Sequence, residues 1–217
     1  MDDSPAFSVD GCDLDDFAAI VEQGTDASAY PLARTVIDGV VIYGPGAGDR
    51  CALRAEVTRA LLDGPGLVVL EGAVDQDAVE QVSAAFWRMI EDQHARGELI
   101  GDHYAKPGAN DRVWNTIEKL AVDDPEAFAT YYASDAIALA AEAWLGPAYQ
   151  ISSQVNVVNP GGEAQQPHRD YHLGFMSDAV ASMYPRHTHL LSPALTLQGA
   201  VAHCDMPVES GPTTFLP

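Results

Sequence analysis

The sequence has few basic residues: 11 Lys and Arg stand against 32 Asp and Glu among 217 residues, a formal net charge of −21. A field of this sign repels phosphate backbones and anionic lipid headgroups, so we expect neither nucleic acid nor a membrane as a partner. The simplest role of the acidic side chains is a solvated, solubilising surface, and a high-salt habitat is an alternative.

Cysteines and long apolar runs are also scarce. Cys12, Cys51 and Cys204 are odd in number and far apart, which predicts neither a disulfide framework nor a structural zinc site. No uninterrupted apolar run of about eighteen residues is present, so we expect no transmembrane helix. The acidic N-terminal segment "MDDSPAFSVDGCDLDD" lacks the basic stretch and apolar run of a secretory signal. We therefore expect a cytoplasmic protein.

Length and composition predict a single domain with a sizeable core, because 217 residues with 47% hydrophobic and 20% charged side chains are ordinary for a globular unit. We expect residues 1–146 to be mainly helical support and residues 147–217 to begin a β core. The clearest helix spans 76–96. Its apolar side chains recur at three- and four-residue spacing and predict a core-facing stripe: Val79, Val82, Phe86, Met89 and Ile90. The other predicted helices cover 13–23, 50–63 after an N-cap at Asp49, 125–132 and 135–145.

Strands are predicted mostly after Pro147. Two come early, and four follow with an irregular stretch around Pro185 between them: 35–44, 67–72, 149–158, 167–175, 194–204 and 212–217. This order predicts an α+β fold in which helices buttress a sheet or barrel. Residues 101–118 are polar and aromatic without periodicity, which predicts a surface loop or a pocket wall, with Trp114 and Asn115 as pocket candidates.

The segment "PHRDYHLGF" (167–175) concentrates metal-binding side chains. In an extended chain, His168, Asp170 and His172 share one face, since side chains alternate. An imidazole and a carboxylate two residues apart can fill two adjacent corners of an octahedral site, as in the 2-His-1-carboxylate triad of non-haem Fe(II) oxygenases. An H-x-D triplet alone is common, and a solvated or hydrogen-bonded histidine is then the simpler interpretation.

Three segments, in this order, resemble the phytanoyl-CoA dioxygenase family of Fe(II)/2-oxoglutarate-dependent oxygenases. "GLVVLEGAVDQDAVEQV" is similar to the opening strand and helix of the family, and "VNVVNPGGEAQQPHRDYH" to its iron-binding strand. "DMPVESGPTTFLP" resembles the hairpin that follows. The resemblance covers roughly residues 65–217.

The resemblance implies a double-stranded β-helix (jelly-roll or cupin-like) core with N-terminal helices packed outside. It also implies Fe(II), 2-oxoglutarate and O₂, and hydroxylation of a small-molecule C–H bond with decarboxylation of 2-oxoglutarate to succinate and CO₂. His168 and Asp170 match the first two iron ligands. The resemblance also implies Asn156 and Gln198 as cosubstrate contacts and His172 near the substrate or around the ligands. Gln154 joins the cosubstrate contacts because strand alternation puts it on the face of Asn156, and Trp114, the pocket candidate, joins His172.

The chain departs from the family pattern at its end. The distal iron-binding histidine of the family, and the arginine that pairs with 2-oxoglutarate, follow the "GPTTFLP" hairpin, where this sequence stops at Pro217. We expect an incomplete oxygenase whose C-terminal strands are missing. We do not expect His203, His187 or His189 to replace the distal ligand, because solvated or hydrogen-bonded histidines are the more common case.

Two alternatives remain beside the oxygenase. One is a catalytically inactive, truncated cupin-like module for binding or interaction. The other is a cupin isomerase or dioxygenase that uses several histidines and no 2-oxoglutarate, which requires three or four clustered imidazoles. Only His168 and His172 share a predicted strand face.

Overall fold

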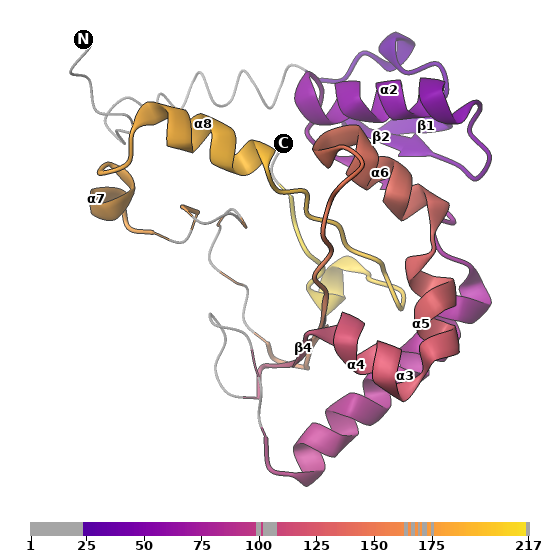
Figure 1. The fold of residues 1–217 in the computed structure, drawn as a ribbon, viewed down its shortest axis with the longest axis vertical. Coiled ribbons are helices and arrows are strands. Elements are labelled where there is room, and N and C mark those ends of the chain that lie inside the picture. Colours follow the sequence, from indigo (N-terminus) through magenta and orange to yellow (C-terminus); the bar gives the residue numbers. More distant parts are fainter. Residues whose placement is uncertain are drawn as a thin grey trace.

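The computed structural model describes residues 24–98, 101, 108–162, 165, 168, 170, 173–174 and 176–215. These residues form a mixed α+β fold with small sheets and several helices (Figure 1). The helix predicted over 13–23 lies outside the described residues. The α+β class is confirmed, whereas the double-stranded β-helix core stays a prediction. No described helix is long and apolar enough to cross a membrane.

The first sheet has the strand order β1-β2-β3, formed by Thr35–Ile37, Val40–Tyr43 and Val68–Leu70. β1 and β2 are antiparallel, and β2 and β3 are parallel. The single strand predicted over 35–44 is wrong, because Asp38 and Gly39 turn the chain with φ values of 50° and 81°. An Asp-Gly pair with positive φ is typical of a two-residue hairpin turn. The strand predicted at 67–72 is confirmed as β3.

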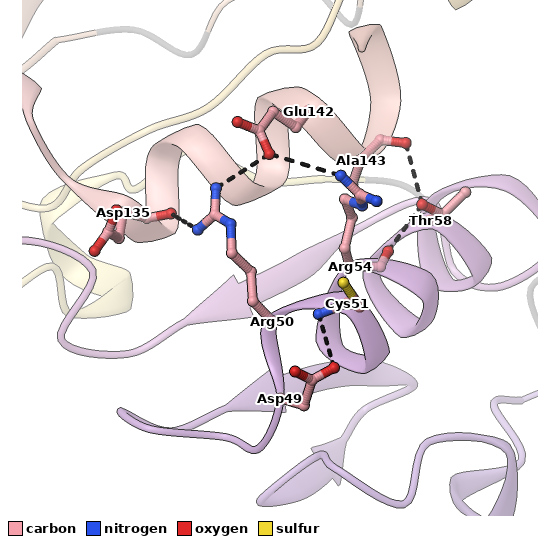
Figure 2. Close-up of polar contacts among 8 residues, drawn as sticks. All are labelled: Asp49, Arg50, Cys51, Arg54, Thr58, Asp135, Glu142 and Ala143. Carbon is pink, nitrogen blue, oxygen red and sulfur yellow. Dashed lines mark hydrogen bonds and ion pairs between the residues drawn. The ribbon is translucent and has the colours of Figure 1, made fainter. Parts of the chain in front are cut away.

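Helix α2 (Arg50–Leu62) packs against helix α6 (Asp135–Leu145), and Figure 2 shows the polar contacts between them. The Asp49 side chain accepts hydrogen bonds from the backbone N–H groups of Cys51 and Ala52, so the predicted N-cap is confirmed. Arg50 Nη2 lies 3.1 Å from Glu142 Oε2. The apolar core beneath these helices includes Tyr30, Val41, Tyr43, Val57, Ala60 and Leu139.

Helix α3 (Gln76–Ala95) carries the predicted apolar stripe into a second core. Val79, Val82, Phe86 and Ile90 are buried, and Met89 packs partly buried beside them. Helices α4 (Thr116–Asp123) and α5 (Pro125–Tyr132) complete this core with Leu120, Ala127 and Tyr131. The helices predicted at 76–96, 125–132 and 135–145 are confirmed as α3, α5 and α6.

The second sheet pairs β4 (Asn110–Trp114) with β5 (Gln154–Val158) in antiparallel register. β4 and the start of α4 lie within residues 101–118, so the surface-loop alternative predicted there is wrong for 110–114 and 116–118. The strand gave no alternating apolar pattern because Asn110, Asp111 and Arg112 are polar and yet buried. The strand predicted at 149–158 is confirmed in its second half.

Two helices, α7 (Asp178–Ala181) and α8 (Arg186–Ala194), occupy the stretch predicted to be irregular. Pro185 stands at the N-cap of α8, a place where a missing N–H costs nothing, so it marks a helix start. The strand predicted at 194–204 is wrong, and no strand occurs among the described residues of 167–175 and 212–217. Alternating apolar residues form a strand only beside a partner, and Val201 packs on the helical core instead. A short 3-10 helix, η3 (Val208–Ser210), follows, and another, η2 (Ala27–Ala29), precedes β1.

Candidate functional site

The structure brings the two predicted metal ligands together. His168 Nε2 lies 3.2 Å from Asp170 Oδ1, and the exposed fractions of these side chains are 20% and 35%. The predicted strand alternation is not what aligns them, because His168 is outside any strand and Asp170 lies in a bend. The two donor atoms therefore lie side by side without the support of strand pairing.

A third predicted residue contacts this pair. The side-chain amide of Gln198 donates a hydrogen bond to Asp170 Oδ2. The cosubstrate contact predicted for Gln198 stays a prediction. The observed hydrogen bond restrains the orientation of the Asp170 carboxylate. Outer contacts of this kind orient a ligating carboxylate and tune the affinity of the site for metal.

The separation of the two atoms fits adjacent ligands of one ion. Imidazole nitrogen and carboxylate oxygen bind a divalent transition metal at roughly 2.0–2.2 Å, so two ligands at a right angle stand about 3 Å apart. The 3.2 Å between His168 Nε2 and Asp170 Oδ1 agrees with this value. An ordinary histidine–aspartate hydrogen bond has the same length. In the part of the chain that the structure describes, no group of three His, Cys, Asp or Glu side chains could hold a metal ion.

The other predicted cosubstrate contacts lie on the sheet of β4 and β5. Asn156 pairs with Arg112, and Gln154 pairs with Trp114, so these four side chains share one face. Asn156 Oδ1 accepts a hydrogen bond of 2.7 Å from Asn110 Nδ2. The opposite face carries Val113 and Val155 toward the helical core.

Sequence reasoning missed Arg112, which is the one cation on this face of the described sheet. Only 9% of the residue is exposed, and its guanidinium carbon lies 4.8 Å from the centroid of the Trp114 ring. A guanidinium presents paired N–H donors that match a carboxylate. The available signal was the period-two spacing of Arg112 and Trp114 in "NDRVW", which is visible only once that segment is known to be a strand.

His187, His189 and His203, among the described residues, have surroundings other than the pair. His203 Nδ1 lies 2.8 Å from Ser83 Oγ, and His203 Nε2 lies 2.8 Å from the Tyr131 hydroxyl oxygen. Burial lowers the pKa of His203 and raises that of Tyr131. His187 is exposed on α8, and His189 Nε2 lies 3.0 Å from the carbonyl oxygen of Ala181. The prediction of hydrogen-bonded or solvated histidines is confirmed for these three, and His172 lies outside the described residues.

A second histidine–carboxylate pair was not foreseen. His94 Nε2, near the end of α3, lies 2.6 Å from Asp111 Oδ1 on β4. Asn159 Nδ2 donates to the other carboxylate oxygen at 3.0 Å. His94 is 17 positions from Asp111 and Asn159 is 48 positions from it, and no sequence motif links residues at these spacings. This pair ties the end of α3 to the second sheet.

The side chains of His168 and Asp170, 3.2 Å apart, are of the types that bind iron in non-haem metal sites. A sequence model of the Phytanoyl-CoA dioxygenase (PhyH) family matches residues 62–217, which include both sheets' last strands, the pair and Gln198. The chain belongs to this family. Membership indicates a dioxygenase of the Fe(II)/2-oxoglutarate type. No curated protein and no solved structure matches the chain significantly.

Proposed function

We propose that the protein is an Fe(II)/2-oxoglutarate-dependent dioxygenase that hydroxylates a C–H bond of a small molecule. The observation that carries the proposal is the 3.2 Å approach of His168 Nε2 to Asp170 Oδ1, within the part of the chain that matches the family. When bound, Fe(II), 2-oxoglutarate and O₂ supply the oxidising chemistry, in which decarboxylation to succinate and CO₂ accompanies hydroxylation.

In this proposal, His168 and Asp170 hold the iron, and Gln198 orients the Asp170 carboxylate through its amide. The fit rests on one imidazole nitrogen and one carboxylate oxygen at the separation of adjacent ligands. The proposal includes a single domain over 1–217 whose helices over 1–146 support a double-stranded β-helix core that begins after residue 147.

The face of the second sheet receives the cosubstrate in this proposal. Arg112 is a largely buried cation there, and a buried guanidinium binds a carboxylate far better than an exposed one, since water competes less. Asn156 and Gln154 offer amide donors on the same face. Trp114 covers one side of the guanidinium and keeps water from it. His172 remains a proposed contact near the substrate.

The test is formation of succinate from 2-oxoglutarate under air, with and without Fe(II), in the wild-type chain. We expect iron-dependent succinate, which His168→Ala and Asp170→Ala abolish. His187→Ala is the matched control, because His187 is exposed and lies on α8. Equal turnover in the wild type and in both variants of the pair would contradict the proposal.

The same assay separates the oxygenase from a catalytically inactive binding module. Such a module gives no succinate at any iron concentration, although it can hold a metal or a small molecule. A cupin enzyme that does not use 2-oxoglutarate consumes O₂ or converts its substrate without forming succinate.

A further inference from the structure

His203 uses both ring nitrogens to attach a segment without regular structure to two helices. Nδ1 lies 2.8 Å from Ser83 Oγ on α3, and Nε2 lies 2.8 Å from the Tyr131 hydroxyl oxygen on α5. The imidazole also packs against Phe86, with ring centroids 5.5 Å apart. Two residues earlier, Val201 packs against the same apolar core.

The hydrogen bonds around His203 determine its tautomer. The Ser83 hydroxyl donates to the carbonyl oxygen of Val79 at 2.6 Å, so its oxygen must accept from His203 Nδ1–H. In the neutral ring, Nε2 then accepts from the Tyr131 hydroxyl. With His203 neutral, each of the three donors, the Ser83 hydroxyl, His203 Nδ1–H and the Tyr131 hydroxyl, has one acceptor.

Gln198 lies five positions before His203, on the same segment. Its amide donates to Asp170 Oδ2, while Asp170 Oδ1 faces His168 Nε2 at 3.2 Å. Residues 196–202 belong to no helix or strand, so no strand pairing sets the position of Gln198. In Figure 1 this segment runs from the end of α8 toward the helices around α5. The segment is fixed to the end of α8 at Leu195 and Thr196 on one side of Gln198, and its attachment at Val201 and His203 limits where the Gln198 amide can reach from the other side.

We propose that His203 is a positioning residue for the metal-binding pair: by fastening the segment to α3 and α5, it holds Gln198 against the Asp170 carboxylate. The metal-dependent part of this inference rests on the proposed function. Loss of the His203 anchor releases the segment, so the Gln198 amide leaves Asp170 and the carboxylate gains rotamers that do not face His168.

The first test needs no metal. The side-chain amide of Gln198 is observed by ¹⁵N NMR in the full chain and is assigned by its absence in Gln198→Leu. We expect a slowly exchanging, hydrogen-bonded amide in the wild type and in His187→Ala, and the shifts of a free glutamine side chain in His203→Ala. An unchanged Gln198 amide in folded His203→Ala would overturn the role of His203.

Tyr131→Phe keeps the test valid if His203→Ala does not fold. It removes the hydroxyl that donates to His203 Nε2 and keeps the aromatic ring that packs in the core. We expect the Gln198 amide to exchange faster in this variant as well. Slow exchange equal to that of the wild type would count against the proposal.

The second test is a double-mutant cycle on metal affinity, measured by Co(II) absorption titration of the wild type, His203→Ala, Gln198→Leu and the double variant. Removing an outer contact of a metal ligand weakens binding about 10–100-fold. If His203 acts through Gln198, the double variant binds no more weakly than either single variant. Additive losses, or an unchanged affinity in His203→Ala, would overturn the proposal.

Failure of the proposed function gives a different result. In that case, wild-type Co(II) affinity does not change in Asp170→Ala, which overturns the function and the metal-dependent role together. A merely structural role of His203 lowers the free energy of unfolding and leaves both the Gln198 amide and the Co(II) affinity of the folded protein unchanged.

Discussion

Gln198 and His168 contact different oxygens of the Asp170 carboxylate: the Gln198 amide donates to Oδ2, while Oδ1 lies 3.2 Å from His168 Nε2. A free aspartate side chain rotates about two torsions and loses conformational entropy when it binds a metal. A side chain that is already held in one rotamer loses less entropy on binding, so the free energy of binding is more favourable. The hydrogen bond from Gln198 therefore favours metal binding, because it keeps the Asp170 carboxylate oriented beside His168 before the ion arrives.

Replacing Gln198 tests the first contact in this order. Gln198→Leu has a similar volume and no donor, and we expect it to weaken divalent metal binding about tenfold, as other losses of outer contacts do. Isothermal titration with Mn(II) measures the change. Gln150→Leu, another exposed glutamine of the chain, is the control and should bind like the wild type. Equal affinities for the wild type and Gln198→Leu would show that the contact does not matter.

Arg112 is expected to determine affinity for 2-oxoglutarate and not for metal. Arg112→Lys keeps the charge and loses both the paired N–H donors and the stacking on Trp114. Truncating one partner of a buried charge pair costs about 2–5 kcal/mol, and we expect the Lys variant to raise the KM for 2-oxoglutarate at least tenfold. Metal affinity should change little.

Steady-state succinate formation measures this KM, with Arg88→Lys on the exposed side of α3 as the control. A KM for 2-oxoglutarate that is the same in Arg112→Lys and in the control would remove Arg112 from the cosubstrate site.

Glu56 is predicted to stabilise the fold far from the metal pair. Its buried carboxylate accepts from the backbone N–H of Leu32 at 3.1 and 3.2 Å and from the Tyr43 hydroxyl at 3.3 Å. Burial and this carboxylate together raise the pKa of Tyr43. Glu56→Ala leaves both donors without their acceptor, which costs about 1–3 kcal/mol of unfolding free energy.

Urea unfolding followed by tryptophan fluorescence checks the Glu56 prediction. Glu91→Ala changes an exposed glutamate of α3 and should stay within about 0.5 kcal/mol of the wild type. Equal stability of Glu56→Ala and Glu91→Ala would contradict the account of this buried carboxylate.

Stability is expected to fall in mild acid because of His203. Burial lowers its pKa below the ordinary value of 6.5, so the unfolded chain binds a proton more readily than the folded chain. The contribution of neutral His203 to the free energy of unfolding is fully present above about pH 6.5. It is lost as the pH falls from there through the pKa of His203 in the folded chain. Urea unfolding at about pH 7.5 and about pH 5.5 should show a larger loss in the wild type than in His203→Gln. An equal loss in both proteins would contradict the prediction.

Helices α2, α3, α5 and α6 were predictable because their pattern is local, whereas α4, α7 and α8 were missed. The apolar stripe of α3 and the cap at Asp49 act within one or two turns, and the sequence alone shows them. The hairpin at Asp38 and Gly39 was equally visible, and a rule about Asp-Gly turns would have split the strand predicted over 35–44.

The strands and the site depend on contacts between distant residues. β4 is mostly buried although Asn110, Asp111 and Arg112 are polar, and side chains from other segments hydrogen-bond to Asn110 and Asp111. His203 lies outside any strand, although a strand was predicted over 194–204, and both of its ring nitrogens have side-chain partners. The partners of His203, Ser83 and Tyr131, lie 120 and 72 positions away in the sequence, and no local pattern predicts contacts over such separations.

The central claim is that His168 and Asp170 together hold one divalent metal ion. Anaerobic titration of the full chain with Fe(II) tests it most directly, with His168→Ala, Asp170→Ala and the control His187→Ala in parallel. We predict binding of one ion per chain in the wild type and in the control, and loss of that binding in each variant of the pair. Iron affinity that is the same in all four proteins would contradict the account.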